Sequence, residues 1–298
     1  MSAIDELQAA IQAVATRVGP AVVGIGRHQR GSGVVVADGR VLTNAHNVRG
    51  EQVTVTFADG RSTAGRLAGI DVDGDLAVIE VDTAGATPLA WGAGDGLATG
   101  AAVFGAAASP TGGTRVTFGT VSAVARAFRG PGGRRIGGSV EHTAPLAPGS
   151  SGGPIVDADG NFLGLNTNRL GEGFYLALPA DAALRARVDA LGSGERVERP
   201  RLGVAIAPAH VASRLRRSVG LPERDGLLVR DVEDGSPAAR AGIAQGDLIV
   251  AVGGKDITDP DELVEAIAAA TGPYEIRIVR GTEERTVTVG GAAATGEA

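Results

Sequence analysis

The chain has 298 residues, no cysteine and a net charge of −6. The lack of cysteine excludes disulfides, thiol catalysis and cysteine-ligated zinc, and four scattered histidines do not suggest another metal site. We therefore expect no metal and no cofactor. The 28 basic residues form no stripe interleaved with aromatic side chains, which argues against nucleic-acid binding. The length predicts two domains, and 47 glycines indicate many short strands joined by tight turns.

Residues 1–19 are predicted to form a helical segment, with an amphipathic helix over 2–18. Ser2 and Asp5 have the spacing of a capping box, and Gly19-Pro20 ends the helix. No run of about 18 apolar residues could form a membrane segment, and no basic stretch precedes an apolar one at the N-terminus. We expect the chain as given to be cytoplasmic, and periplasmic or otherwise extracytoplasmic if it is part of a longer sequence.

Residues 20–192 are predicted to form a domain made mostly of short strands. Apolar runs are separated by turn signals such as Asp38-Gly39 and Asp59-Gly60, and strands do not alternate regularly with helices. This pattern favours a pair of β-barrels or a sandwich over a doubly wound sheet. A helix is predicted over 181–191, and Gly192 ends it.

A second, smaller domain is predicted over 201–290, after a linker at 193–200 that contains glycine and many charges. Its strands are mixed with helices that we expect near 209–218, 236–241 and 260–270. Residues 291–298 are expected to be a disordered tail.

The segment 148–154 reads Pro-Gly-Ser-Ser-Gly-Gly-Pro. A serine on a glycine-rich turn can expose its hydroxyl while backbone N–H groups point the same way. Such a segment can supply a nucleophile and an oxyanion hole together. The alternative is a serine in an ordinary glycine turn.

A histidine and three acidic residues precede this segment. His46 could act as general base and then as general acid, because imidazole titrates near neutral pH. Asp71, Asp73 and Asp75 compete for the third role, and their spacing does not match a calcium-binding loop. The chain order His, Asp, Ser is that of the chymotrypsin-type triad, not that of subtilisin or the α/β-hydrolases. The order therefore favours a serine endoprotease.

Together these motifs resemble those of the HtrA/Deg-type serine proteases, in which a chymotrypsin-like domain precedes one PDZ domain. The matching segments are Leu-Thr-Asn-Ala-His at 42–46, Asp-Leu-Ala-Val at 75–78, residues 148–154, Gly-Leu-Asn-Thr at 164–167, Gly-Ser-Pro-Ala-Ala at 235–239, Ala-Gly-Ile at 241–243 and Gly-Asp-Leu-Ile at 246–249. The resemblance covers about residues 20–290. It implies a mostly β fold, with a chymotrypsin-like double β-barrel followed by a small α+β PDZ domain.

The resemblance also implies the roles of the triad. The family's acid stands immediately before Leu-Ala-Val, which selects Asp75 to orient and stabilise the imidazole of His46. Ser151 becomes the nucleophile, and Asp71 and Asp73 are then expected to be solvated turn residues.

The oxyanion hole is expected at Gly149, Ser150 and Ser151, with the backbone N–H groups of Gly149 and Ser151 as donors. Two residues depart from the family. Ser150 stands where Asn is usual, and Asn47 stands where Val is common. Because the hole uses backbone N–H groups, the change at Ser150 does not threaten the nucleophile.

The substrate pocket is expected between the segments before and after the nucleophile, at Pro145, Leu146, Leu165 and Asn166. Pro145 supplies no carboxylate at the base of the pocket, which disfavours cleavage after Arg or Lys. Leu146 and Leu165 instead suggest a modest apolar pocket for Val, Ala, Ile or Leu.

Residues 126–138 hold Arg126, Arg129, Arg134 and Arg135 among glycines. One interpretation is a flexible, solvated loop. The resemblance implies another, a regulatory loop that senses peptide binding and orders the active site.

In the second domain, the PDZ loop whose backbone N–H groups hold a peptide's terminal carboxylate is matched by Arg201, Leu202, Gly203 and Val204. Leu263 or Ile267 could face the peptide groove, and core packing is the equal alternative.

These expectations describe an ATP-independent serine endopeptidase, a hydrolase of protein quality control and stress response. It would cleave unfolded or misfolded polypeptides and bind C-terminal peptides at its PDZ groove. The alternative is a proteolytically latent chaperone or a PDZ-based binding scaffold. The resemblance also implies a homotrimer built through the N-terminal segment. No aromatic residue precedes Phe57, however, and the helix at 2–18 could pack on its own domain.

Overall fold

The computed structural model divides the chain into two compact units, Met1–Val197 and Glu198–Ala298. The residues that the structure describes are 2–27, 29–130, 135–171, 173–194 and 201–290. Most of the predicted linker and the whole predicted tail lie outside these ranges, so the domain boundaries stay predictions. No helix among the described residues is long and apolar enough to cross a membrane.

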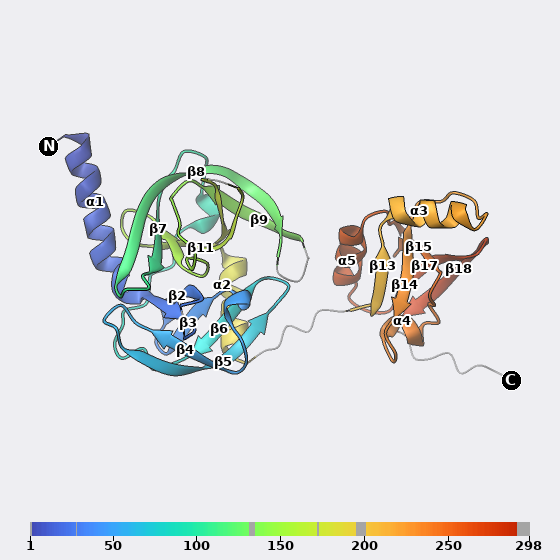
Figure 1. Cartoon of the computed structure of the whole chain (residues 1–298), viewed down its shortest axis with the longest axis horizontal. Coiled ribbons are helices and arrows are strands. Elements are labelled where there is room, and N and C mark those ends of the chain that lie inside the picture. The colour runs from blue at the N-terminus through green and yellow to red at the C-terminus, as the bar shows by residue number, and fades with distance from the viewer. Residues whose placement is uncertain (1, 28, 131–134, 172, 195–200, 291–298) are drawn as a thin grey trace. The chain divides into compact units, whose positions relative to one another are not determined.

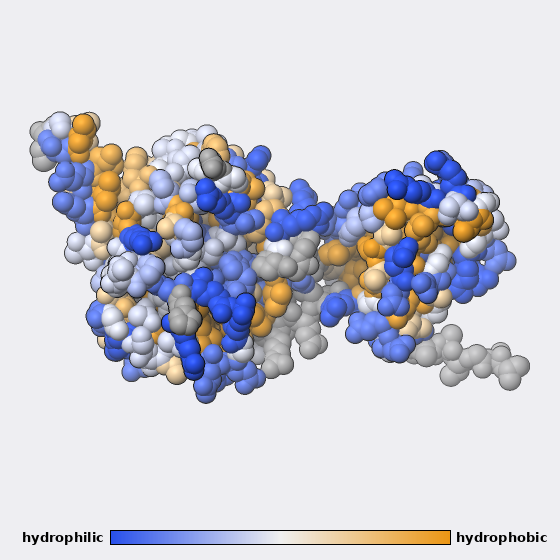
Figure 2. All heavy atoms as spheres, viewed as in Figure 1, coloured by the Kyte–Doolittle hydropathy of each residue, from blue (hydrophilic) through white to orange (hydrophobic). Residues whose placement is uncertain are grey.

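The first unit begins with helix α1 (Ala3–Val18), which starts at the predicted capping box. The side chain of Ser2 accepts from the N–H of Asp5 at 3.2 Å, and Asp5 accepts from the N–H of Ser2 at 2.8 Å. Val14 and Val18 are buried against the barrels, whereas Ile4, near the start of the helix, is 76% exposed. Figure 1 shows the N-terminal half of α1 extending away from the barrels, and Figure 2 shows apolar side chains gathered along one side of it.

Six antiparallel strands close into the first barrel in the order β1-β2-β3-β6-β5-β4. Their bounds are β1 (Val22–Ile25), β2 (Gly31–Ala37), β3 (Arg40–Thr43), β4 (Gln52–Thr56), β5 (Ser62–Asp71) and β6 (Leu76–Glu80). Two short 3₁₀ turns belong to this part, η1 (Gly19–Ala21) and η2 (Ala45–Asn47). Pairing of β3 with β6 brings the end of one strand beside the start of the other.

A second closed barrel follows, in the order β10-β11-β12-β9-β8-β7. Its strands are β7 (Ala102–Ala108), β8 (Thr114–Arg129), β9 (Arg135–His142), β10 (Pro154–Val156), β11 (Phe162–Arg169) and β12 (Tyr175–Pro179). The turn η3 (Gly94–Gly96) lies between the barrels in sequence. Helix α2 (Ala182–Gly192) begins at its N-cap Asp181, follows the second barrel and packs on β5 and β6 of the first.

One hydrophobic core joins the two barrels. It includes Val34 of the first barrel, Phe162 of the second and Leu191 of α2, all of them fully buried. Burial of an aliphatic or aromatic side chain contributes about 1.5–3 kcal/mol. Because residues of both barrels contribute to this one core, the core holds one barrel against the other.

The segment expected to be a flexible loop at 126–138 is mostly a hairpin of β8 and β9. Arg126 pairs in register with Ser139, and Arg129 with Arg135. Phe128 is only 7% exposed, so the hairpin has a packed side. The loop prediction is therefore wrong for Arg126, Arg129 and Arg135, because these residues pair between β8 and β9. Arg134 lies outside the described residues.

The second unit is a sheet in the order β13-β14-β15-β17-β18, with β16 paired to β15. Its strands are β13 (Val204–Ala207), β14 (Leu227–Val232), β15 (Leu248–Val252), β16 (Lys255–Asp256), β17 (Tyr274–Arg280) and β18 (Glu283–Val289). Its helices are α3 (Ala209–Ser218), α4 (Pro237–Arg240) and α5 (Pro260–Ala269). The predicted architecture, mostly β with a double barrel followed by a small α+β domain, is confirmed.

Candidate active site

His46 and Asp75 lie together because they occupy neighbouring ends of β3 and β6. His46 is in η2, just after β3, and Asp75 immediately precedes β6. The Nδ1 atom of His46 is 2.9 Å from Oδ1 and 3.0 Å from Oδ2 of Asp75. The backbone N–H of His46 also donates to Asp75 Oδ1 at 3.2 Å. Of the three competing acids, Asp75 is thus the one in contact with the histidine.

The carboxylate of Asp75 is held from several directions. The residue is 1% exposed and has the left-handed backbone angle φ +55°. Thr167 of β11 donates its hydroxyl to Asp75 Oδ2 at 2.7 Å, and Asn44 donates its side-chain amide to the Asp75 carbonyl at 3.0 Å. No role for Thr167 could be predicted from the sequence, because only the folded barrels bring β11 to this carboxylate.

The expectation that Asp71 is a solvated turn residue is wrong. Asp71 is 2% exposed and accepts from the N–H of Gly74 at 2.8 Å. Its other oxygen forms an ion pair with Arg187 of α2. Helix α2 covers this end of the first barrel, so Asp71 anchors the turn that leads to Asp75. Asp73 is partly buried.

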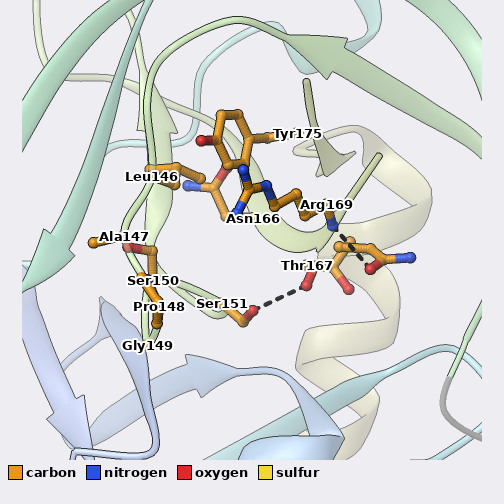
Figure 3. Close-up of a pocket in the computed structure, with 11 residues that line it drawn as sticks. Leu146, Ala147, Pro148, Gly149, Ser150, Ser151, Asn166, Thr167, Arg169 and Tyr175 are labelled. Atoms are coloured by element: carbon orange, nitrogen blue, oxygen red, sulfur yellow. Dashed lines mark hydrogen bonds between the residues drawn. The ribbon is translucent and has the colours of Figure 1, made fainter. Parts of the chain in front are cut away.

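Ser151 lies in the segment between β9 and β10. Its hydroxyl donates to the carbonyl oxygen of Thr167 at 3.0 Å, as the dashed line in Figure 3 marks. No hydrogen bond joins Ser151 and His46 in the described part of the chain. Ser151 and His46 both lie at the boundary between the barrels, and the serine hydroxyl is turned to Thr167.

The backbone around Ser151 has the form expected for an oxyanion hole. Gly149 has φ +85°, a conformation that favours glycine. Within the described residues, the N–H groups of Gly149 and Ser151 have no hydrogen-bond partner, whereas the N–H of Ser150 donates to the carbonyl of Ala147 at 3.2 Å. Ser150 itself is 6% exposed. Two N–H groups without partners, that of the serine itself and that of the residue two positions before it, are available to receive an oxyanion.

A pocket opens beside Ser151, lined by residues 146–151, 166–169 and Tyr175. Leu146 and Asn166 lie in it, as expected (Figure 3). Pro145 and Leu165 do not, which corrects that part of the prediction. Leu165 is fully buried and faces the barrel core, while Pro145 is exposed at the surface.

The pocket is more polar than the sequence suggested, because the end of β11 and the start of β12 both contribute to it. Arg169 places its guanidinium 5.8 Å from the centre of the Tyr175 ring and donates from Nε to the carbonyl of Gly171 at 2.7 Å. Among the described residues, no carboxylate pairs with Arg169. Figure 3 shows its side chain extending towards Tyr175 and Asn166, so the pocket holds a positive charge.

In the second unit, the predicted carboxylate loop leads into the edge strand β13. Gly203 has φ +77°, and a Cβ there would come within 2.3 Å of the Ser236 side chain, so this position requires glycine. Arg201 is exposed and Leu202 is 4% exposed. Val204 begins β13, whose only paired neighbour in the described sheet is β14.

Leu263 and Ile267 of α5 are both buried in the core of the second unit, at 3% and 4% exposure. Of the two alternatives left open by the sequence, the observed contacts are those of core packing.

Comparison with known proteins agrees with this geometry. A trypsin-like peptidase domain matches residues 31–165, and a PDZ domain matches residues 228–280. A structure of the HtrA-type protease AlgW with a decapeptide is 27% identical, with a TM-score of 0.73, over 94% of this chain and 97% of that one. The putative serine protease HhoA of Synechocystis sp. is 36% identical over 279 residues, which are 87% of this chain and 70% of HhoA. The chain belongs to the HtrA family of serine proteases.

The resemblance inferred from the motifs is thereby confirmed. A probable periplasmic DegP-like serine endoprotease of Halomonas elongata is 33% identical over 88% of this chain and 56% of that protein. This HtrA-family chain thus spans between 56% and 70% of the length of these two curated relatives.

One buried histidine of this HtrA-family chain supports the nucleophile segment. His142 is fully buried, and its Nε2 is 2.8 Å from Oδ1 of Asn166. The backbone of Asn166 in turn accepts from the N–H of Gly152 at 2.7 Å and donates to Gly153 at 2.9 Å. In the described residues His142 Nδ1 has no partner, so a proton there would be buried without an acceptor. Burial accordingly lowers the pKa of His142. His142 belongs to no motif in the sequence, so only the folded structure reveals this contact.

The pKa of His142 predicts an acid-sensitive fold. The unfolded chain binds a proton at this histidine at higher pH than the folded chain does, so the free energy of unfolding should fall as pH drops below about 6.5. Urea unfolding at about pH 7.5 and pH 5 measures this. In His142→Gln, whose amide can still donate to Asn166 but cannot ionise, the loss between the two pH values should be smaller. Equal losses in both proteins would contradict the prediction.

Proposed function

We propose that the chain is an ATP-independent serine endopeptidase that cleaves unfolded or misfolded polypeptides. The observation that carries the proposal is the His46–Asp75 pair at 2.9 Å, facing a segment where Ser151 stands beside two unengaged N–H groups. Family membership adds support, since the relatives are named serine proteases.

The first step concerns the base. Because Nδ1 of His46 lies against both oxygens of Asp75, Nδ1 carries the proton and Nε2 is left as the acceptor. The Ser151 hydroxyl then has to rotate from the Thr167 carbonyl towards Nε2. Catalytic hydrogen bonds commonly tighten only when substrate binds.

Ser151 Oγ then attacks the scissile carbonyl carbon while its proton passes to His46 Nε2. The carbonyl oxygen becomes an oxyanion, which the N–H groups of Gly149 and Ser151 would stabilise. Asp75 stabilises the imidazolium that forms. As the C–N bond breaks, His46 returns the proton to the leaving amine, and an ester to Ser151 remains. Water, activated by the same imidazole, hydrolyses the ester and restores the hydroxyl.

An extended, β-pairing substrate cleft, as expected for a protease of this family, would select unfolded chains, because a folded protein rarely presents an accessible extended segment. At the pocket, Leu146 supports the small apolar preference expected from the sequence, and Arg169 opposes a basic side chain by charge repulsion.

Peptide binding by the second unit is part of the proposal. The edge strand β13 can accept an added strand, and residues 201–204 would hold a terminal carboxylate through backbone N–H groups. The structure of AlgW with a decapeptide supports peptide binding in this family. Regulation through the β8–β9 hairpin stays a prediction for Arg126, Arg129 and Arg135.

A second candidate function is a proteolytically latent chaperone or PDZ-based scaffold. The bond from the Ser151 hydroxyl to Thr167 favours it, since in that orientation the nucleophile does not contact its base.

Location and assembly are proposed from the relatives and from α1. A relative named as periplasmic supports action outside the cytoplasm, in place of the cytoplasmic expectation for the chain as given. The homotrimer stays a prediction. Ile4 and Leu7 leave an exposed apolar edge on α1 that a neighbouring subunit could cover, while Val14 and Val18 pack on the chain's own barrels.

The peptidase proposal predicts that wild-type protein hydrolyses fluorescent casein without ATP and that Ser151→Ala reduces the rate by at least about a thousandfold. A C-terminal peptide that binds the PDZ domain should raise the wild-type rate. Casein protection from aggregation, with equal and negligible hydrolysis in both proteins, would favour the latent chaperone instead.

The charge of Arg169 predicts the specificity of the pocket. In a peptide-library digest, cleavage after Lys or Arg should be rare, and Arg169→Glu should raise its share about tenfold by replacing repulsion with attraction. Arg169→Gln is the matched control and should give an intermediate share. If the charge reversal leaves the profile unchanged, the pocket described here does not receive the residue before the cut.

A further inference from the structure

Asn47 is the residue next to His46, and its side chain crosses from the first barrel to the nucleophile segment. It is 3% exposed and lies in η2. Its Nδ2 donates to the carbonyl oxygen of Ser151 at 2.9 Å and to Thr43 Oγ1 at 3.0 Å. One short turn therefore carries both the proposed base and a direct contact to the backbone of the proposed nucleophile.

The surrounding hydrogen bonds fix the orientation of this amide. Thr43 donates its own hydroxyl proton to the carbonyl of Ser32 at 2.6 Å, so Thr43 Oγ1 can only accept from Asn47. The Ser151 carbonyl is also an acceptor. Both contacts therefore require the NH₂ group, and Asn47 Oδ1 is left buried with no partner among the described residues. A buried acceptor without a donor costs free energy, which offsets part of what the two donated hydrogen bonds contribute to stability.

The neighbouring backbone leaves room for the amide. A Cβ on Gly31 would lie 2.2 Å from the Asn47 side chain. A Cβ on Gly152 would lie 2.1 Å from the Ser32 carbonyl and 3.0 Å from Asn47 Nδ2. Glycine at both positions lets the nucleophile segment approach the first barrel closely enough for direct hydrogen bonds.

Ser32 makes the companion contacts. Its N–H donates to the Ser151 carbonyl at 2.8 Å, and its hydroxyl donates to the Gly149 carbonyl at 2.9 Å. The Ser151 carbonyl thus accepts two hydrogen bonds from the first barrel, one from Ser32 on β2 and one from Asn47 on the turn that holds His46.

We propose that Asn47 is a positioning residue that sets the separation and angle between His46 and Ser151. It acts through the Ser151 carbonyl and does not touch the reacting atoms. This inference rests on the proposed peptidase function. Asn47 is the residue directly after His46. Its hydrogen bond to the Ser151 carbonyl therefore resists any displacement of the nucleophile segment that would separate Ser151 from His46.

The test is the rate at which a small fluorophosphonate labels Ser151, because such a reagent needs the nucleophile and base but not the extended substrate site. Asn47→Val keeps the approximate volume and removes the donor, and it should slow labelling about tenfold to a hundredfold. The KM for a peptide substrate and the affinity for a PDZ peptide should stay unchanged, while kcat falls with the labelling rate. Asn161→Ala, which removes a side-chain hydrogen bond to Asp157 in the turn before β11, is the control and should label like wild type.

Asn47→Asp is the second variant, since it keeps the shape and replaces the donor by an acceptor. It should label at least as slowly as Asn47→Val. A folded Asn47→Val or Asn47→Asp that labels within twofold of wild type overturns the inference. So does failure of both variants to fold, because Asn47 would then be structural. If wild type itself does not label, it is the proposed function that fails.

Discussion

The site depends on Thr167, which contacts both halves of the proposed catalytic group. Its hydroxyl donates to Asp75 at 2.7 Å, and its carbonyl accepts from the Ser151 hydroxyl at 3.0 Å. Asp75 belongs to the first barrel and Thr167 to the second, so these bonds join the barrels where the chemistry would take place. A small shift of one barrel against the other would break them. The continuous hydrophobic core beneath the site is what prevents that shift.

Thr167 also distinguishes the observed site from a catalytically active one, because it holds the Ser151 hydroxyl away from His46. The bond between Ser151 and Thr167 leaves the His46–Asp75 pair and the free N–H groups intact. For catalysis the hydroxyl would have to turn from the Thr167 carbonyl to the base. A latent and an active protein would then differ in whether a substrate is bound at the site.

Local patterns predicted much of the local structure, although the β8–β9 hairpin was expected to be a loop, and contacts distant in sequence were missed. The capping box at Ser2 needs only the residues that follow it, so the sequence was sufficient there. Asp71 was misjudged because its partner, Arg187, is more than a hundred residues away on α2. Leu165 was assigned to the pocket because a motif does not tell which face of a strand is inside. The triad resemblance identified His46 and Asp75, but the part played by Thr167 required both barrels.

In the proposed mechanism, His46 activates Ser151 across the barrel boundary. Mass spectrometry after fluorophosphonate treatment tests it directly, by locating and counting the adduct in wild type and in His46→Ala. We expect one adduct per chain, on Ser151, and its near-complete loss in His46→Ala. An adduct on another residue, or equal labelling of Ser151 without His46, would contradict it.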